Sequence, residues 1–333
     1  MRVTALVSSV VLALGLTLAQ NCARAATADE VKNYPVRPVR LILASGPGSS
    51  PDVIGRMVAN KLSEAWGHSV VVDNRPGATG LIAVELLSRS APDGYTVGMF
   101  TMTNLIAMLM YQKYMLASEL SAVTLVGTTP FAIVVNAKTP VKNLAEFIAY
   151  AKARPGQLRY GSTGMWGSLH MCMEEILKMT GMQMTHVPYK SAVPVMNDLI
   201  AGDIHVFCPA APMLGPYIKA GKIRLLGETY KETTKLLPGV PPVAETVPGF
   251  ALYGWYGMHA PRGTPPAIIQ KINAEVVKAL KDPKLAQIML ITGAEAVGSS
   301  PEEYAKWLQK DEAYWTRLLT QSGANLGKPM GKH

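Results

Sequence analysis

Short runs of β-branched and other apolar residues alternate along the chain with longer amphipathic stretches. Val39–Ala44 and Ser69–Val72 have the composition of strands, and between them apolar residues recur at helical spacing up to Gly67, a typical helix stop. Tyr95–Phe100 and Phe131–Asn136 repeat the strand pattern. Because strands that alternate with helices build layered sheets, the pattern predicts an α/β protein with largely parallel strands.

The chain is long enough for two domains. It has 333 residues, against roughly 150 for an average domain, and its strand–helix rhythm restarts after Asn136. We expect two lobes, each a mostly parallel sheet flanked by helices, with a cleft between them. Lobe 1 is predicted over residues 26–131 and 253–333 and lobe 2 over residues 132–252, with crossover strands near Phe131–Asn136 and Tyr253–Ala260.

Residues 1–25 have the three parts of a secretory signal peptide. Arg2 gives the charged start, Ala5–Ala19 the apolar middle and Ala23-Arg24-Ala25 the small-residue exit. Cleavage is expected after Ala25, with Ala28 as the alternative. The apolar run is shorter than the roughly 20 residues that cross a bilayer, so we expect an exported, periplasmic protein. Cys22 raises lipidation as an alternative, although the residues before it do not fit a lipoprotein signal.

Composition argues against several classes of function. Removing residues 1–25 takes away Arg2 and Arg24 and leaves 30 basic and 23 acidic residues, a net charge of +7. The chain has no run of Lys or Arg, so no nucleic-acid partner is expected. The histidines lie too far apart to suggest a metal site, and no cofactor is expected. Cys172 and Cys208 remain after cleavage, and the sequence leaves open whether they form a disulfide.

The segment Ser45–Asp52, here called the first loop, leads from a predicted strand into a predicted helix. Ser50 is a favoured N-cap residue and Pro51 suits the first helical position. Free backbone N–H groups there, with the Ser49 and Ser50 hydroxyls, form an anion site. Each hydrogen bond to a charged acceptor contributes about 1.5–3 kcal/mol, so two or three would hold a carboxylate. Because Asp52 would repel that carboxylate, we expect it to stabilise the helix start instead.

The segment Gly161–Ser168, here called the second loop, has the same design. It follows a predicted strand, precedes a predicted helix and is rich in Gly, Ser and Thr. Each loop alone is ordinary for a capped helix, whereas two such loops in two lobes favour a ligand gripped from both sides. His170 suits either a donor to a carboxylate or a structural role, and Trp166 suits either packing or stacking on an aromatic ligand.

The two loops belong to a longer set of motifs that resembles the Bug-type periplasmic receptors of tripartite tricarboxylate transporters. The matching segments span nearly the whole chain after the signal peptide, and the most specific are Asn74–Ala78 (Asn-Arg-Pro-Gly-Ala) and Pro92–Thr96 (Pro-Asp-Gly-Tyr-Thr). The others, besides the loops, are Tyr34-Pro35, Pro38–Ile42, Val187–Lys190, Ile218–Arg224 and Ala260–Pro265.

The resemblance implies a two-lobe, type II periplasmic binding protein fold. It also implies a small carboxylate in the cleft, capture by lobe closure, and delivery to a two-component membrane permease driven by an ion gradient. We expect the receptor to be a monomer. The ligand-binding residues expected from this pattern and its neighbourhood are Gly48, Ser49, Ser50, Asp52, Thr103, Ser162, Thr163, Trp166, Ser168, His170, Tyr189 and Cys208.

The chain departs from the family pattern at several of these positions. In the first loop Ser45 replaces an aromatic residue, Ser49 a glycine and Pro51 a threonine. Cys208 stands where the family commonly has an aspartate, which would suit a ligand ammonium group, so dicarboxylic amino acids become doubtful ligands. Trp166 stands where small residues are usual, which makes an aromatic mono- or dicarboxylate a candidate.

Two other classes of function share parts of this pattern. A hydrolase or transferase would need motifs that are absent, such as Gly-x-Ser-x-Gly or a phosphate loop, so no enzyme is expected. Ser162 or Ser168 beside His170 could imitate a nucleophile and base, but neighbours in one helical turn rarely hold attack geometry. A sensory receptor that reports to a membrane kinase stays open, because it shares every feature of a transport receptor.

Overall fold

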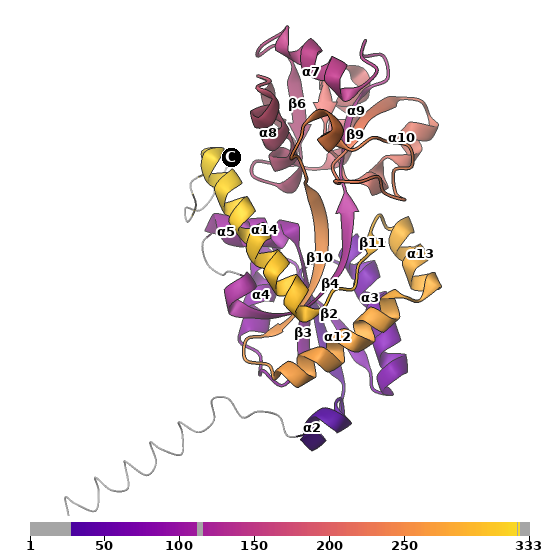
Figure 1. The fold of residues 1–333 in the computed structure, drawn as a ribbon, viewed down its shortest axis with the longest axis vertical. Helices are drawn as coiled ribbons and strands as arrows, with labels where there is room; N and C mark the ends of the chain where they lie inside the picture. The colour runs from indigo at the N-terminus through magenta and orange to yellow at the C-terminus, as the bar shows by residue number, and fades with distance from the viewer. Residues whose placement is uncertain (1–27, 112–115, 325, 327–333) are drawn as a thin grey trace, which may run out of the picture.

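The computed structural model describes residues 28–111, 116–324 and 326. The predicted signal peptide, with its cleavage point after Ala25, lies outside these residues. The described chain forms two lobes, each with its own β-sheet, stacked along the long axis of the molecule (Figure 1). Among the described residues, no helix is both long enough and apolar enough to cross a membrane.

Lobe 1 is built on a six-stranded sheet of order β11-β4-β10-β3-β1-β2. Its strands are β1 (Val39–Leu43), β2 (Val70–Asn74), β3 (Thr96–Thr101), β4 (Leu120–Pro130), β10 (Tyr253–Pro261) and β11 (Glu295–Ala296). β1 pairs in parallel with β2 and β3, whereas β10 runs antiparallel to both β3 and β4. The strands β1, β2, β3 and β4 therefore all run in one direction.

Helices cover both faces of this sheet because successive strand residues face opposite sides. Leu41 and Leu43 of β1 belong to the same core as Ile54 of α3 (Ser50–Trp66), whereas Ile42 belongs to a second core with Leu81. The other helices of lobe 1 are α2 (Ala28–Asn33), η1 (Ala78–Gly80), α4 (Leu81–Ser88), α5 (Met102–Tyr111), α6 (Leu116–Glu119), α12 (Pro266–Leu280), α13 (Pro283–Ile291) and α14 (Pro301–Gln321).

Lobe 2 is built on a five-stranded sheet of order β7-β6-β8-β5-β9. Its strands are β5 (Ala132–Asn136), β6 (Arg159–Ser162), β7 (Thr185–Pro188), β8 (Val206–Phe207) and β9 (Ile223–Glu228). β6 pairs in parallel with β7 and β8, whereas β5 runs antiparallel to β8 and β9. The helices of lobe 2 are α7 (Leu144–Lys152), α8 (Ser168–Thr180), α9 (Ala192–Ala201), η2 (Ala211–Met213), α10 (Gly215–Lys219) and α11 (Val243–Thr246).

The strand directions bring one edge of each sheet to face the other lobe. β4 leaves lobe 1 through Pro130 and continues into β5, so the carboxyl ends of β1, β2 and β3 point toward lobe 2 (Figure 1). β6, β7 and β8 run opposite to β5, so their carboxyl ends point back toward lobe 1. The loops at these carboxyl ends, where α/β proteins bind ligands, therefore face each other.

The expected two-lobe α/β architecture is confirmed, with three local differences. Both sheets are mixed rather than mostly parallel, because each crossover strand enters antiparallel to a neighbour. The 11-residue strand β4 had no predicted counterpart, since most of its residues are buried and its apolar–polar alternation is weak. The helix after the first loop starts one residue earlier than predicted, with Ser49 as its N-cap and Ser50 as its first residue.

Candidate functional site

The first and second loops occupy equivalent places in the two sheets. β1 lies between β2 and β3, and β6 lies between β7 and β8, so each is the strand where the chain connections diverge. The first loop leaves the carboxyl end of β1, and the second loop includes the carboxyl end of β6. In open α/β sheets this switch point forms a ligand-binding crevice. The topology therefore places both predicted loops where a ligand could contact the two lobes at once.

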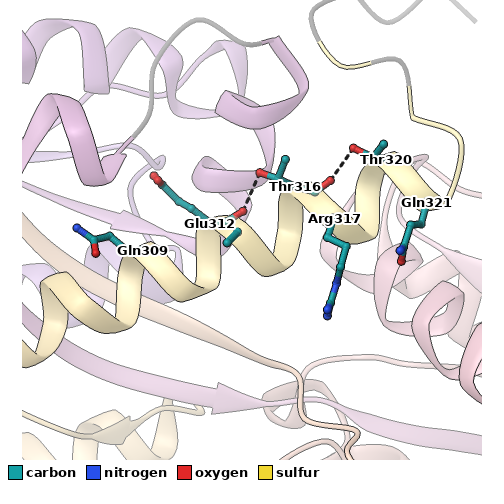
Figure 2. Close-up of a pocket in the computed structure, with 7 residues that line it drawn as sticks. Gln309, Glu312, Thr316, Arg317, Thr320 and Gln321 are labelled. Atoms are coloured by element: carbon teal, nitrogen blue, oxygen red, sulfur yellow. Dashed lines mark hydrogen bonds between the residues drawn. The ribbon is translucent and has the colours of Figure 1, made fainter.

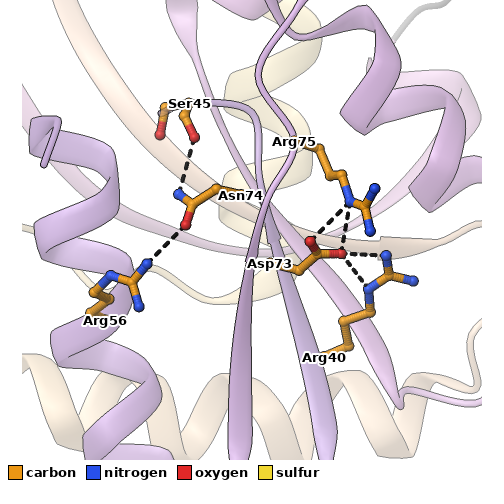
Figure 3. Close-up of polar contacts among 6 residues, drawn as sticks. All are labelled: Arg40, Ser45, Arg56, Asp73, Asn74 and Arg75. Atoms are coloured by element: carbon orange, nitrogen blue, oxygen red, sulfur yellow. Dashed lines mark hydrogen bonds and ion pairs between the residues drawn. The ribbon is translucent and has the colours of Figure 1, made fainter. Parts of the chain in front are cut away.

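Asp52 of α3 organises the first loop. The residue is 3% exposed, and its carboxylate accepts hydrogen bonds from Gly48 N at 2.9 Å and Asn74 Nδ2 at 2.8 Å. Arg56 Nε lies 3.0 Å from Asp52 Oδ1, and the same guanidinium donates to Asn74 Oδ1 at 2.8 Å. Asn74 also donates to the Ser45 carbonyl at 3.0 Å (Figure 3). These contacts tie the loop to the end of the neighbouring strand β2.

The negative charge of the Asp52 carboxylate is balanced by the donors in this network. Burial would raise the pKa of the carboxyl group, but hydrogen bonds from Arg56, Gly48 and Asn74 outweigh burial and lower the pKa. The ionised carboxylate already has three donors and would repel a second carboxylate. This geometry fits the expected role of Asp52 in stabilising the helix start.

The amino terminus of α3 lacks a side-chain cap. Ser49 is the N-cap residue, but its hydroxyl donates to the Gly46 carbonyl at 2.7 Å and accepts no helix N–H. Pro51 has no N–H, so the first turn presents the N–H groups of Ser50 and Asp52, which have no partner within the helix. The first loop thus offers backbone donors at the end that faces lobe 2.

Two arginines that share one carboxylate leave a net positive charge beside the first loop. Asp73 of β2 accepts from Arg40 Nε at 2.7 Å and from Arg75 Nε at 2.9 Å (Figure 3). Burial would raise the pKa of Asp73, but the two arginines outweigh it and lower the pKa. Two guanidinium groups on one carboxylate leave a net positive charge, and half-exposed Arg75 lies just beyond the carboxyl end of β2.

Asn104 of α5 joins the carboxyl end of β3 to η1 at this edge of lobe 1. Its Oδ1 accepts from Thr101 N at 2.8 Å, and its Nδ2 donates to the Thr79 carbonyl at 3.0 Å. A Cβ on Gly80 would lie 2.3 Å from Asn104 Nδ2, so the close approach requires glycine. Thr103, predicted as a ligand residue, is exposed in the first turn of α5 beside this contact.

In the second loop, Trp166 has a left-handed backbone conformation with φ of 62°. This conformation costs a bulky residue about 1–2 kcal/mol, so other contacts must hold it. Trp166 N donates to His170 Nδ1 at 3.1 Å, and the two rings pack at 81° with centroids 5.4 Å apart. The neighbouring Met165 side chain is 50% exposed.

The Ser162 hydroxyl closes the other end of the second loop. Ser162 is fully buried, and its Oγ lies 2.7 Å from His186 Nε2. The same hydroxyl donates to the Gly164 carbonyl at 3.0 Å and accepts from Gly164 N at 3.2 Å. Ser162 therefore shapes the loop from inside, whereas Thr163 and Ser168 are partly exposed.

Helix α8, which begins at Ser168, also lacks a side-chain cap. Its N-cap residue is Gly167, which has no side chain to offer. The N–H groups of Ser168, Leu169 and His170 accordingly have no partner within the helix. The two loops thus present uncapped helix starts, with their partial positive charge, toward each other.

Three stacked rings lie behind the second loop. The ring centroids of His170 and His186 are 4.1 Å apart, and Tyr160 stacks on His186 at 4.9 Å. Tyr160 OH donates to Glu174, whose Oε1 also lies 3.7 Å from His170 Nε2. Burial lowers the pKa of His170 to about 4, and burial together with His170 lowers that of His186 to about 4. Both imidazoles are therefore neutral near pH 7.

Cys172 and Cys208 form a disulfide, and both residues are fully buried. The bond joins α8 to the residue that follows β8. The predicted role of Cys208 as a direct ligand contact is therefore corrected to a structural role. Tyr189 lies next to the second loop, where its N donates to the Ser162 carbonyl at 2.9 Å and its OH donates to Asp198 Oδ2 at 2.6 Å.

The structure gathers the predicted residues at two facing edges. Lobe 1 carries Gly48, Ser49, Ser50, Asp52 and Thr103, and lobe 2 carries Ser162, Thr163, Trp166, Ser168, His170 and Tyr189. Besides Asn104, which lies in the segment Met102–Asn104 that the resemblance also places near the cleft, the residues that support the loops had not been predicted as site residues. They are Arg56, Asn74, Tyr160, His186 and, bonded to the Ser50 hydroxyl, Tyr256. Asn74 lies within the Asn-Arg-Pro-Gly-Ala motif, so the sequence could have indicated it as a site residue. No sequence motif around His186 indicated such a role.

A hollow of about 600 Å³ lies along α14 (Figure 2), and none of the residues that line it belongs to either loop. The Thr316 and Thr320 hydroxyls within it donate to carbonyls of their own helix, and Glu312 accepts from Ala117 N at 2.9 Å. Three of its polar side chains are therefore engaged in holding helix and loop backbone. Across the described parts of the chain, no group of three or more His, Cys, Asp or Glu side chains is placed to hold a metal ion.

Comparison with known proteins assigns this arrangement to a family. The model of the tripartite tricarboxylate transporter family receptor matches residues 54–324. The protein BugT of Bordetella pertussis is 30% identical over 298 residues, which cover 88% of this chain and 91% of that protein.

Two solved structures share the fold over nearly their whole length. A TctC solute binding protein from Polaromonas, solved with no ligand, has a TM-score of 0.80 at 25% identity and covers 86% of this chain and 99% of its own. An R. palustris protein solved with adipate has a TM-score of 0.72 at 32% identity and covers 87% of this chain and 98% of its own.

Proposed function

Because the chain belongs to the tripartite tricarboxylate transporter receptor family, we propose that it captures a small carboxylate between its lobes and delivers it to a two-component membrane permease. Proteins of this family are periplasmic solute-binding receptors rather than enzymes. In this proposal the receptor works outside the cytoplasm as a monomer, after removal of residues 1–25.

The observation that carries the proposal is the pair of uncapped helix starts at facing sheet edges. α3 and α8 each begin without a side-chain cap, directly after a loop rich in Ser and Gly. Free N–H groups and the helix dipole favour an anion at both ends. Each charge-assisted hydrogen bond adds about 1.5–3 kcal/mol, so a few of them support micromolar binding. The positive charge shared by Arg40, Asp73 and Arg75 favours the same kind of ligand.

The direct contacts that we propose are those still available at the two edges. They are the N–H of Ser50, the Thr103 and Thr163 hydroxyls, the Ser168 N–H and hydroxyl, and the rings of Trp166 and Tyr189. Gly48 and Ser49 shape the turn, because their N–H groups donate to Asp52 and to the Gly46 carbonyl. Asp52, Ser162 and His170 hold the loops instead. The exposed side chains of Met165 and Val193 suit a ligand with an apolar body, either aliphatic or aromatic.

Capture would occur by closure of residues 132–252 onto residues 26–131 and 253–333. Within the described residues, the chain passes between the two sheets at two crossovers, from β4 to β5 and from β9 to β10.

A thermal-shift screen tests the proposal. The purified chain from residue 26 is heated with aliphatic and aromatic mono- and dicarboxylates, adipate among them, and with neutral sugars and amides of similar size. A ligand that binds the folded state raises the melting temperature by mass action, and we expect this for carboxylates alone. Neutral solutes that raise it while every carboxylate leaves it unmoved would contradict the proposal.

A further inference from the structure

The second loop holds a tryptophan in a backbone conformation that tryptophan rarely adopts. The φ of Trp166 is 62°, in the region that favours glycine. Glycine at this position would make the same turn without strain. A bulky residue kept there at a cost indicates a use for its side chain rather than for the turn.

His170 is the residue that fixes this conformation. Its Nδ1 accepts the hydrogen bond from Trp166 N at 3.1 Å, so the imidazole proton must be on Nε2. The two rings pack at 81°, an arrangement that occupies at most one face of the indole. The Trp166 side chain is partly exposed, and the free N–H of Ser168 lies two residues further along.

His170 is in turn held from every neighbouring element. His186 of β7 and Tyr160 of β6 stack behind it, and Glu174 of α8 lies 3.7 Å from its Nε2. α5, which also contacts α8, has no charged residue, and Tyr314 of α14 interacts with Glu175 instead. The ring therefore has one orientation, with Nδ1 aimed at the loop.

We infer that His170 is a positioning residue for Trp166, and that Trp166 held in this way makes the site selective for carboxylates that carry a flat aromatic ring. The carboxylate would bind the amino terminus of α8 while the ring stacks on the indole. This inference rests on the proposed function and narrows its ligand class.

The test measures the affinities of benzoate, phenylacetate and adipate for four proteins: wild type, His170→Phe, His170→Asn and Trp166→Ala. Phe keeps the ring volume but has no acceptor, whereas the Asn carbonyl can replace Nδ1. We expect His170→Phe and Trp166→Ala each to weaken both ring-bearing acids about three- to tenfold and adipate less than twofold. His170→Asn should stay near wild type for all three.

A fifth protein, with His170→Phe added to Trp166→Ala, separates positioning from general support of the fold. If His170 acts through Trp166, the added substitution causes no further loss for the ring-bearing acids. A further loss there, an equal loss for adipate, or an Asn variant as weak as the Phe variant would overturn the inference. Wild type that binds adipate but neither ring-bearing acid would also overturn it. Wild type that binds none of the three acids but is stabilised by other carboxylates in the thermal-shift screen would likewise overturn the inference, whereas a failure of every carboxylate in that screen would contradict the proposed function itself.

Discussion

The first and second loops have the same place in their sheets but are held by different interactions. In the first loop, ionised Asp52 is joined to Asn74 and to the partly exposed guanidinium of Arg56. In the second loop, neutral His170 and His186 pack in a buried stack, and a disulfide anchors the helix behind them. A loop that leads into a helix start can thus be fixed by charge or by packing, and only the packed loop also holds a partly exposed aromatic ring, that of Trp166.

Removing the disulfide should have the largest effect and should act on the second loop alone. With Cys172→Ala and Cys208→Ala together, a bond that closes 36 residues is lost, which should lower the free energy of unfolding by about 4 kcal/mol. Denaturant unfolding measures this loss. Hydrogen exchange should become faster over residues 161–172 and stay unchanged over residues 45–52. Equal acceleration in both loops would show that they are not held separately.

Acid should weaken the two loops in different pH windows. The folded pKa of His170 is about 4 against an ordinary value of 6.5, so the unfolded chain takes up the proton first and stability falls as pH drops from 6.5 toward 4. The loss is at most about 3 kcal/mol for this imidazole. The pKa of Asp52 is lowered below 3.8, so its contribution is full above that pH and is lost only below it.

Stability curves for two variants separate these windows. His170→Asn should flatten the dependence of unfolding free energy on pH between 6.5 and 4, whereas Asp52→Asn should leave that part of the curve unchanged in slope. A flattened curve in the Asp52 variant, or an unchanged one in the His170 variant, would mean that other groups cause the acid sensitivity.

A proline at Ser168, the first residue of α8, would remove one N–H from the helix start, as Pro51 does at the second residue of α3. Pro is tolerated at the first helical position but removes one N–H, whereas Ser168→Ala removes only the hydroxyl. Relative to Ala, Pro should weaken carboxylate binding by about 1.5–3 kcal/mol, roughly tenfold or more. Calorimetric titration of both variants checks this. Equal affinities would show that this N–H does not contact the ligand.

Backbone strain should favour glycine over alanine in both loops, although only the first loop has glycine at its left-handed position. Gly48 has φ of 81° with open space around it, so Gly48→Ala should destabilise the protein by about 1 kcal/mol. Trp166 has φ of 62°, so Trp166→Gly should be more stable than Trp166→Ala by about 1 kcal/mol, the reverse of the usual order. Thermal unfolding compares the pairs, and a less stable Gly variant at position 166 would show that the turn is not strained.

Local sequence signals were sufficient for the two loops but not for what holds them. The loops are continuous segments with glycine, serine and helix-start chemistry, so they could be predicted residue by residue. The bonds from Ser162 to His186 and from Asp52 to Asn74 join residues 24 and 22 positions apart, and they exist because β6 neighbours β7 and β1 neighbours β2. The order of strands in a sheet depends on the whole chain, so no sequence motif near these residues indicates which partner each one has.

The sequence left the pairing of Cys172 and Cys208 undecided for the same reason. Cys172 lies on α8 and Cys208 follows β8, and their Cα atoms come within 6.4 Å only when the helix packs beside that strand. The conformation of Trp166 also had no sequence signal, since its neighbours Gly164 and Gly167 are the residues expected at a turn. The site residues remain predictions, and four of them, Asp52, Ser162, His170 and Cys208, have partners in the structure that only the fold assigns.

Solution X-ray scattering with one matched pair of solutes tests the central claim most directly. The carboxylate that gives the largest thermal shift is compared with its own carboxamide, which has the same shape without the charge. A carboxylate that bridges the two helix starts should lower the radius of gyration by closing the lobes, and the amide should not. An unchanged radius with saturating carboxylate, or the same decrease with the amide, would contradict the account.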